Sequence, residues 1–351
     1  MNNELYSGYL TLVTAEPDEQ PVEQLSHDTS GWINRTPWND SQWTKIHNPT
    51  VILTGMPLPE EKIQLLKTIP NKPFVLLYTS KPEDYRRNFP PLVDGIVKCS
   101  DGDKLLSLNN LSRIISGLKT FSEIYTWQPT LEKKSLVAVT YCSATESAFL
   151  LLQQHLITTK WQVIGIHADG FCGQILEYAA KNRLIHATIE LSSNELAYNL
   201  LADYQYLGVN RLTGAAIAGI PQVICTGGLD AMTHQEPVSG GELPTDRAVL
   251  LDDQGNLFTR LLPPELDLVG QEIASKACAS SGKVAILHPT SGLSDRDRPI
   301  SPFWHPEANA TLWQSMLNWV NNDVTLQEIP QHMCEETMVQ RIVETFLAVT
   351  K

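Results

Sequence analysis

The stretch Trp161–Glu177, WQVIGIHADGFCGQILE, decides the fold class. An apolar strand pattern ends at His167, passes through a turn that contains Gly170 and Gly173, and leads into the helical pattern ILEYAAKNRL. Glycine allows the backbone to turn sharply after a strand, and the positive end of the next helix dipole favours a phosphate or a carboxylate. The stretch therefore predicts a strand–turn–helix unit of an α/β protein with an anion site at its turn.

A second glycine turn follows about fifty residues later. The apolar run GIPQVICT ends in Thr226-Gly227-Gly228-Leu-Asp230. Two such turns in one domain favour a shared site for a small anionic ligand, because ligand sites in parallel sheets gather at the carboxyl ends of the strands. The alternative for each turn is an ordinary strand-to-helix connection, since short glycine motifs often match by chance.

Strand and helix patterns alternate along most of the 351 residues, which predicts parallel sheets covered by helices. A chain of this length exceeds what one hydrophobic core usually serves. The polar segment Trp127–Lys134, which contains Pro129, separates two patterned blocks. We therefore predict two Rossmann-like α/β domains, residues 1–130 and 135–351, with mainly parallel sheets and a ligand cleft between them.

Residues 1–48 have no clear period apart from YLTLVT (Tyr9–Thr14), which favours a strand. The rest of the first block contains three strand patterns, VILTG, PFVLLYTS and DGIVKCS, and two helical patterns, PEEKIQLLKTI and LLSLNNLSRIISGLKTFSEI. The second block predicts six strands: SLVAVTYCS, WQVIGIHADG, HATIELS, IPQVICTGG, KVAILHPTSG and VTLQEIP. Its further helices are TESAFLLLQQHLITT, with Thr145 as N-cap, ELAYNLLADYQ, RLTGAAIAG, LDLVGQEIASKACAS, TLWQSMLNWV and TMVQRIVETFLAVTK.

Charge and cysteine usage exclude several classes of partner. With 26 basic and 39 acidic residues the formal charge is −13, which disfavours nucleic acid and anionic membrane. The chain has no 18-residue apolar run and its first residues lack a signal-peptide pattern, so we expect a cytoplasmic protein. The six cysteines form no CxxC pair, so neither a disulfide framework nor a zinc site is indicated, and we predict no metal ligands.

Several blocks in order carry a family resemblance: HADGFCGQILE, NRLTGAAIAGIPQVICTGGLDAM, VAILHPTSGLSDRDRPISPFWHPEANATLWQSM and EIPQH. From Leu136 to Phe346 the chain resembles a two-domain family of mostly uncharacterised bacterial proteins, which includes the tomato mosaic virus resistance protein of tomato and is often labelled ATP-binding. The resemblance implies ATP as the ligand and leaves a requirement for Mg²⁺ unknown.

The chain also departs from that family. Where members carry Gly-Gly-Ser-Gly-Gly, this chain has Thr54-Gly55-Met-Pro57-Leu-Pro59, and proline removes backbone donors. We therefore expect a shortened, degenerate first domain. Asp252-Asp253 and His332-Met-Cys-Glu335 replace the family's His-Asn and His-Ile-Asn-Asp strings, so the ligand or the catalysis is expected to be altered or lost.

Two residues are candidates for catalysis. His167 follows a strand and is suited to act as a general acid or base, and Asp230 is suited to orient it. The alternatives are a histidine bonded to nearby backbone and a first-turn carboxylate that faces a helix dipole. Candidate ligand-binding residues are the turn hydroxyls, the glycine turns and two arginines that could pair with a phosphate: Thr140, Ser143, Thr145, Asp169, Gly170, Gly173, Arg211, Thr226, Gly227, Gly228 and Arg247.

Other motifs have two interpretations. Asp295-Arg296-Asp297-Arg298 either lines the cleft or forms a solvated, internally paired loop. Cys142 is either a nucleophile or a small apolar filler, and burial is the commoner fate of a free cysteine. His288 and His332 lie near strand ends, where either a site role or a structural role is open.

Three function classes follow. The leading prediction is a protein that binds a small anion or an ATP-like nucleotide, with lost or altered catalysis. The first alternative is a hydrolase or a C–C or C–O lyase for a small carboxylated metabolite, with His167 as base and the amides of Gly227 and Gly228 stabilising an oxyanion. The second alternative is a non-catalytic partner or assembly protein that uses residues 1–48. We also expect a homo-oligomer.

Overall fold

The computed structural model describes residues 10–14, 33–37, 50–54, 61, 74–78, 96–98, 117, 120, 123–124, 134–168, 171–201, 211–234, 244–251 and 257–351. The chain divides into two compact units, Met1–Gln128 and Pro129–Lys351. Among the described residues, no helix combines the length and the apolar character that a membrane-spanning segment needs.

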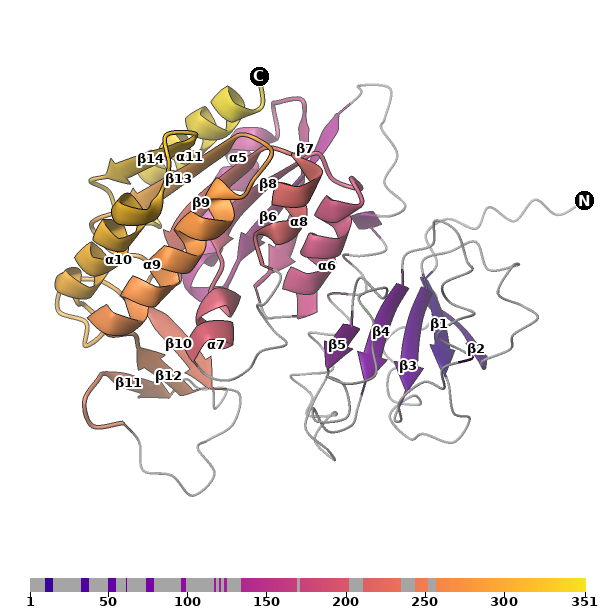
Figure 1. Ribbon diagram of the computed structural model, residues 1–351, viewed down its shortest axis with the longest axis horizontal. Helices are drawn as coiled ribbons and strands as arrows, with labels where there is room; N and C mark the ends of the chain where they lie inside the picture. The colour runs from indigo at the N-terminus through magenta and orange to yellow at the C-terminus, as the bar shows by residue number, and fades with distance from the viewer. Residues whose placement is uncertain are drawn as a thin grey trace, which may run out of the picture. The chain divides into compact units, whose positions relative to one another are not determined.

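The first unit contains a five-stranded parallel sheet in the order β2-β1-β3-β4-β5 (Figure 1). Its strands are β1 (Leu10–Thr14), β2 (Ile33–Pro37), β3 (Thr50–Thr54), β4 (Phe74–Tyr78) and β5 (Ile96–Lys98). The patterns did not predict β2, which lies in the segment without a clear period. The Rossmann-like form of this unit stays a prediction, because its expected helices lie largely outside the described residues.

The second unit is built on a six-stranded sheet in the order β14-β13-β9-β8-β6-β7, and every pairing is parallel. Its strands are β6 (Ser135–Tyr141), β7 (Trp161–His167), β8 (Ala187–Ser192), β9 (Gln222–Gly227), β13 (Val284–Pro289) and β14 (Val324–Ile329). All residues of β8, β9 and β13 are buried, as expected for strands covered on both faces. The α/β fold class is therefore confirmed for this unit.

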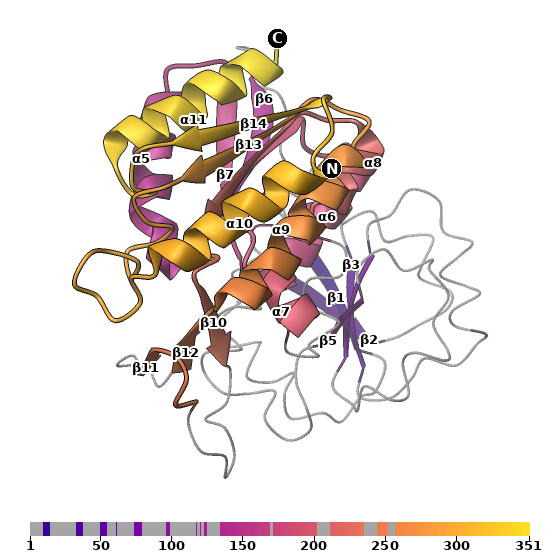
Figure 2. The same ribbon diagram turned by 60° about the vertical axis from the view of Figure 1, so that its left-hand side comes forward.

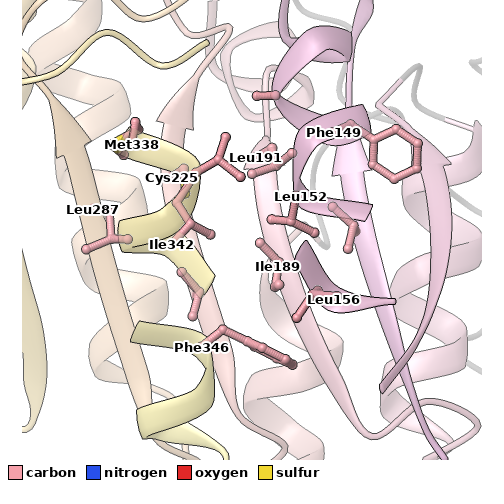
Figure 3. Packing of buried hydrophobic residues seen from close by; sticks show 14 of the residues in the cluster. Phe149, Leu152, Leu156, Ile189, Leu191, Cys225, Leu287, Met338, Ile342 and Phe346 are labelled. Atoms are coloured by element: carbon pink, nitrogen blue, oxygen red, sulfur yellow. The ribbon is translucent and has the colours of Figure 1, made fainter. Parts of the chain in front are cut away.

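Helices cover both faces of this sheet (Figures 1 and 2). One face carries α5 (Glu146–Leu156) and α11 (Glu336–Val349). Side chains of these two helices, such as Leu152 and Ile342, meet Ile189 of β8 in a common core (Figure 3). The other face carries α6 (Phe171–Lys181), α7 (Glu195–Leu201), α8 (Thr213–Ala218), α9 (Pro263–Cys278) and α10 (Pro306–Trp319).

The connections of β6 and β8 leave the sheet on opposite faces. After β6 the chain enters α5, whereas after β8 it enters α7 on the other side. These two strands are neighbours in the sheet. Adjacent strands whose connections diverge in this way leave a crevice at their carboxyl ends, where ligands of open α/β sheets bind. The fold thus places the candidate site between the ends of β6 and β8.

A small antiparallel sheet follows β9 in the sequence and was not predicted. It consists of β10 (Ala231–His234), β12 (Leu257–Arg260) and β11 (Val249–Leu251), in that order. Phe258 of β12 is buried beside Ala231 and Phe303. This sheet therefore supplies a buried aromatic ring next to the connection between β13 and α10.

Candidate functional site

The turn after β6 forms a helix start. A single 3-10 turn, η4 (Ser143–Thr145), runs directly into α5. The hydroxyl of Thr145 accepts a hydrogen bond from the backbone N–H of Cys142 at 3.0 Å and makes no cap bond to α5. Thr145 is therefore engaged within the turn. The first N–H groups of a helix lack partners within the helix, so those of Ser143 and Ala144 are suited to receive an anion.

The end of β8 packs tightly against this turn. Ser192 Oγ lies 3.3 Å from Cys142 Sγ and 3.1 Å from the carbonyl oxygen of Gly227. Gly228 adopts a φ of +71°, and a Cβ added there would overlap Ser192 Oγ and lie 3.0 Å from Cys142 Sγ. Close packing of the ends of β6, β8 and β9 therefore requires a glycine at position 228. Thr140 lies within the same packing, with its hydroxyl 2.7 Å from the carbonyl oxygen of Ser192.

The connection between β13 and α10, residues 290–305, covers the end of β9 and reaches the end of β6. We call it the β13–α10 loop. The N–H of Gly228 donates to the carbonyl oxygen of Leu293 at 2.9 Å, and the N–H of Asp295 donates to the carbonyl oxygen of Ala144 at 3.0 Å. The amide of Gly228 is therefore used within the fold, which speaks against a role for it in binding an anion.

Arg296 brings a positive charge to the turn after β6. Its Nη2 lies 3.3 Å from the hydroxyl oxygen of Ser143, and its guanidinium lies over the ring of Phe258 at 3.9 Å. Among the residues that the structure describes, no carboxylate oxygen lies within 4.0 Å of Arg296, whereas Arg298 pairs with Asp295 at 3.1 Å. The guanidinium is therefore oriented by a hydroxyl and a ring while its charge is left for a ligand. We call Cys142, Ser143, Ala144, Ser192 and Arg296 the strand-end site.

Arg211, by contrast, is enclosed by carboxylates. It pairs with Glu177 at 2.5 Å, Glu190 at 2.6 Å and Glu195 at 3.2 Å, and all four side chains are buried. Burial opposes its charge, but the three carboxylates raise the pKa of Arg211 well above its usual range, and burial raises the pKa of Glu177. A Cβ at Gly173 would overlap the Glu195 carboxylate. Nε, Nη1 and Nη2 of Arg211 each donate to one of these carboxylates, so the positive charge of Arg211 is already paired inside a buried ion cluster that leaves no room for a Cβ at Gly173.

The two residues expected to act as a catalytic pair are not brought together. His167 ends β7, at the edge of the sheet, beside the ring of Tyr141. Asp230 follows β9, and β6 and β8 lie between these strands, a separation of about 14 Å at the usual strand spacing. Asp230 is buried and accepts a hydrogen bond from Ser294 at 2.8 Å; burial, followed by the charge of Asp297, raises its pKa.

Two further candidates are occupied by neighbours. Arg247 pairs with Glu265 at 2.7 Å and with Asp246 at 3.1 Å. The hydroxyl of Thr226 lies 2.9 Å from Nδ1 of His288, and both residues are buried. Burial lowers the pKa of His288 to about 4, so this ring is neutral near pH 7. Asp169 and Gly170 lie outside the described residues, so the first glycine turn is not defined at its bend.

Four residues of the strand-end site were absent from the sequence prediction of ligand contacts: Cys142, Ala144, Ser192 and Arg296. Ser192 begins the string Ser-Ser-Asn between a strand and a helix, which is a cap signal that could have been used. Arg296 lies in a charge run that predicted either the cleft or a solvated loop. Among the described residues, no group of three or more His, Cys, Asp or Glu side chains is arranged to hold a metal ion.

Residues 134–350 match the C-terminal domain of an uncharacterised protein family, UPF0261. The chain belongs to this family. It is 24% identical over 219 residues to a UPF0261 protein of Brucella suis, a match that covers 62% of this chain and 52% of that protein. A UPF0261 protein of Clostridium tetani is 23% identical over 58% of this chain and 51% of its own length.

A plant protein also matches this UPF0261 chain. The ToMV resistance protein Tm-1(GCR237) of Solanum lycopersicum is 21% identical over 219 residues, which are 62% of this chain and 29% of the tomato protein. The chain thus spans about half the length of the bacterial relatives named above. The predicted family is confirmed, and the ATP-binding property that the resemblance implied is a separate proposal.

Proposed function

We propose that the second unit of this UPF0261 chain binds a small anionic ligand at the strand-end site. The observation that carries the proposal is the placement of Arg296, a half-buried guanidinium fixed by Phe258 and Ser143, with no carboxylate within 4.0 Å among the described residues. A charge held in this way at η4, the turn that leads into α5, suits a phosphate or carboxylate group, because guanidinium, hydroxyl and amide N–H groups all donate to anionic oxygens. Within this class, the resemblance favours a nucleotide such as ATP.

The competing enzyme hypothesis has less support. It required His167 and Asp230 to act together and Gly228 to offer its amide, but the sheet order separates the first two and the third donates to Leu293. The partner hypothesis concerns residues 1–48, most of which lie outside the described residues. Binding of an anion at the strand-end site is therefore the function that the described contacts favour.

The test is a thermal-shift and calorimetric titration of the full chain with ATP, AMP, inorganic phosphate and citrate, with and without Mg²⁺. A ligand present at a hundred times its Kd should stabilise the fold by about 2.7 kcal/mol. Arg296→Gln should weaken binding about tenfold or more, because it removes a hydrogen bond to a charged group. Arg341→Gln, which removes an exposed arginine paired with Glu344, is the matched control.

Two outcomes would refute the proposal. The first is the absence of binding by every anion tested. The second is binding that Arg296→Gln leaves unchanged, which would place the ligand elsewhere in the chain.

A further inference from the structure

His332 is held in one protonation state by its two neighbours. The ring is buried in the turn between β14 and α11, where Nδ1 accepts a hydrogen bond from the backbone N–H of Cys334 at 3.1 Å. Nε2 lies 3.0 Å from the carbonyl oxygen of Ser294. An N–H group can only donate and a carbonyl oxygen can only accept. In this geometry the imidazole is therefore neutral, with its single proton on Nε2.

The ring joins the turn after β14 to the β13–α10 loop. The N–H of Met333 donates to the carbonyl oxygen of Gly292 at 3.0 Å, and a Cβ at Gly292 would lie 2.9 Å from Nε2 of His332. Ser294, whose carbonyl oxygen accepts the hydrogen bond from Nε2, lies two residues before Arg296. The hydrogen bonds of His332 therefore fix the backbone that presents Arg296 to the end of β6.

We propose that His332 is a pH-sensitive latch on the β13–α10 loop. When Nδ1 takes up a proton from solvent, it faces the N–H of Cys334 as a second donor, so the ring leaves its position, the hydrogen bond from Nε2 to Ser294 is lost, and the loop that carries Arg296 loosens. The consequence for anion binding rests on the proposed function, whereas the loosening itself does not.

The charges around the ring determine the direction of the effect. Burial and then the positive charge of Arg298 lower the pKa of His332, while the Ser294 carbonyl, Asp295 and Asp297 act in the opposite direction. On its own turn, Glu335 accepts a hydrogen bond from the backbone N–H of His332 at 3.3 Å. A pKa lowered in the closed loop means that the closed loop favours the neutral ring. The latch therefore holds above about pH 6.5 and is lost as the pH falls.

Hydrogen–deuterium exchange of the full chain measures the latch directly. Between about pH 7.5 and about pH 5, protection of the amides of Asp295 and Cys334, corrected for the intrinsic exchange rate, should fall by up to about thirtyfold, since a free imidazole is protonated over this range. His332→Asn keeps an acceptor near Nδ1 but does not titrate, so its protection should be independent of pH. His155→Asn removes a partly exposed histidine beside Glu336 and should behave like the wild type.

A second measurement covers the case in which the variant does not fold. Nitrogen chemical shifts of His332 in the wild-type chain should show a neutral ring with its proton on Nε2 at pH 7.5 or so, and a protonated ring when the loop opens. A ring that stays neutral to about pH 5, or loop protection that does not change with pH, would overturn the latch.

Anion titrations separate the latch from the proposed function. Sulfate is the probe, because its charge does not change over this pH range, and its affinity should fall in parallel with loop protection. If protection falls but no anion binds at any pH, the latch stands and the proposed function fails. If sulfate binds more tightly at low pH while the loop stays closed, the proposed function stands and the latch fails.

Discussion

Replacing Gly228 by alanine should destabilise the second unit more than replacing Gly219. Both glycines have a left-handed backbone, with φ of +71° and +67°. This conformation costs a residue with a Cβ about 1–2 kcal/mol. At Gly228 the added methyl group would also overlap Ser192 Oγ and lie 3.0 Å from Cys142 Sγ. Overpacking of this kind typically costs about 1–3 kcal/mol more, for a total of about 2–5 kcal/mol.

Gly219 is the matched control for this substitution. Its added methyl group would lie 3.2 Å from Ser281 Oγ, a contact that a shift of a few tenths of an ångström relieves. The expected loss is about 1 kcal/mol, because the lower entropy of the unfolded chain offsets part of the backbone cost. Scanning calorimetry of the full chain should show a difference in Tm of several degrees, at about 2–4 °C per kcal/mol. Equal losses at both positions would refute the close packing of the three strand ends.

Three further predictions concern the core and its buried charges. Arg211→Met should lower the free energy of unfolding by about 3–5 kcal/mol near pH 7 in urea denaturation, because it leaves three buried carboxylates without their arginine. This loss should shrink as acid protonates the carboxylates, and a loss that does not depend on pH would contradict the prediction. The pKa of His288 is about 4 in the folded chain and about 6.5 in the unfolded chain, so the unfolded chain binds a proton first and the wild type should lose about 3 kcal/mol of stability as the pH falls from about 6.5 to 4. His288→Gln should therefore show a shallower dependence of Tm on pH. Phe346→Ala should cost about 3–5 kcal/mol, because this ring is fully buried against Trp161, whereas Leu317→Ala on the exposed side of α10 should change stability by less than about 0.5 kcal/mol by the same denaturation assay.

The six strands of the parallel sheet in the second unit could be predicted because each is an apolar run bounded by polar residues. Helix starts were less well defined. The predicted helix that begins at Thr311 in fact begins at Pro306, because proline fits the first turn of a helix and needs no N–H partner there. The small antiparallel sheet was missed, since its strands have only three or four residues, although VLL-DDQG-NLFTR has the form of a hairpin.

The sequence predicted the part of the sheet where the candidate site lies, but not which side chains form it. The glycine turn at Gly227 and Gly228 correctly indicated strand ends, yet the glycine at position 228 serves close packing and its amide is already bonded. Arg211 matched the residue type suited to a phosphate, but three glutamates that are far from it in sequence enclose it. The sequence did not distinguish Arg296 from the neighbouring charges of residues 295–298, because its role depends on contacts with Phe258 and Ser143 that form only in the folded chain.

The separation along the chain between the two halves of the strand-end site has a consequence for synthesis on the ribosome. Ser143 and Arg296 are 153 residues apart, and His332 lies further still towards the end. A nascent chain that has exposed β6, β7, β8 and β9 still lacks the guanidinium and the residues that fix its loop. Anion binding would therefore begin only after the chain has emerged through the β13–α10 loop and the turn after β14, so a ligand would stabilise molecules that contain the whole second unit and not shorter nascent chains.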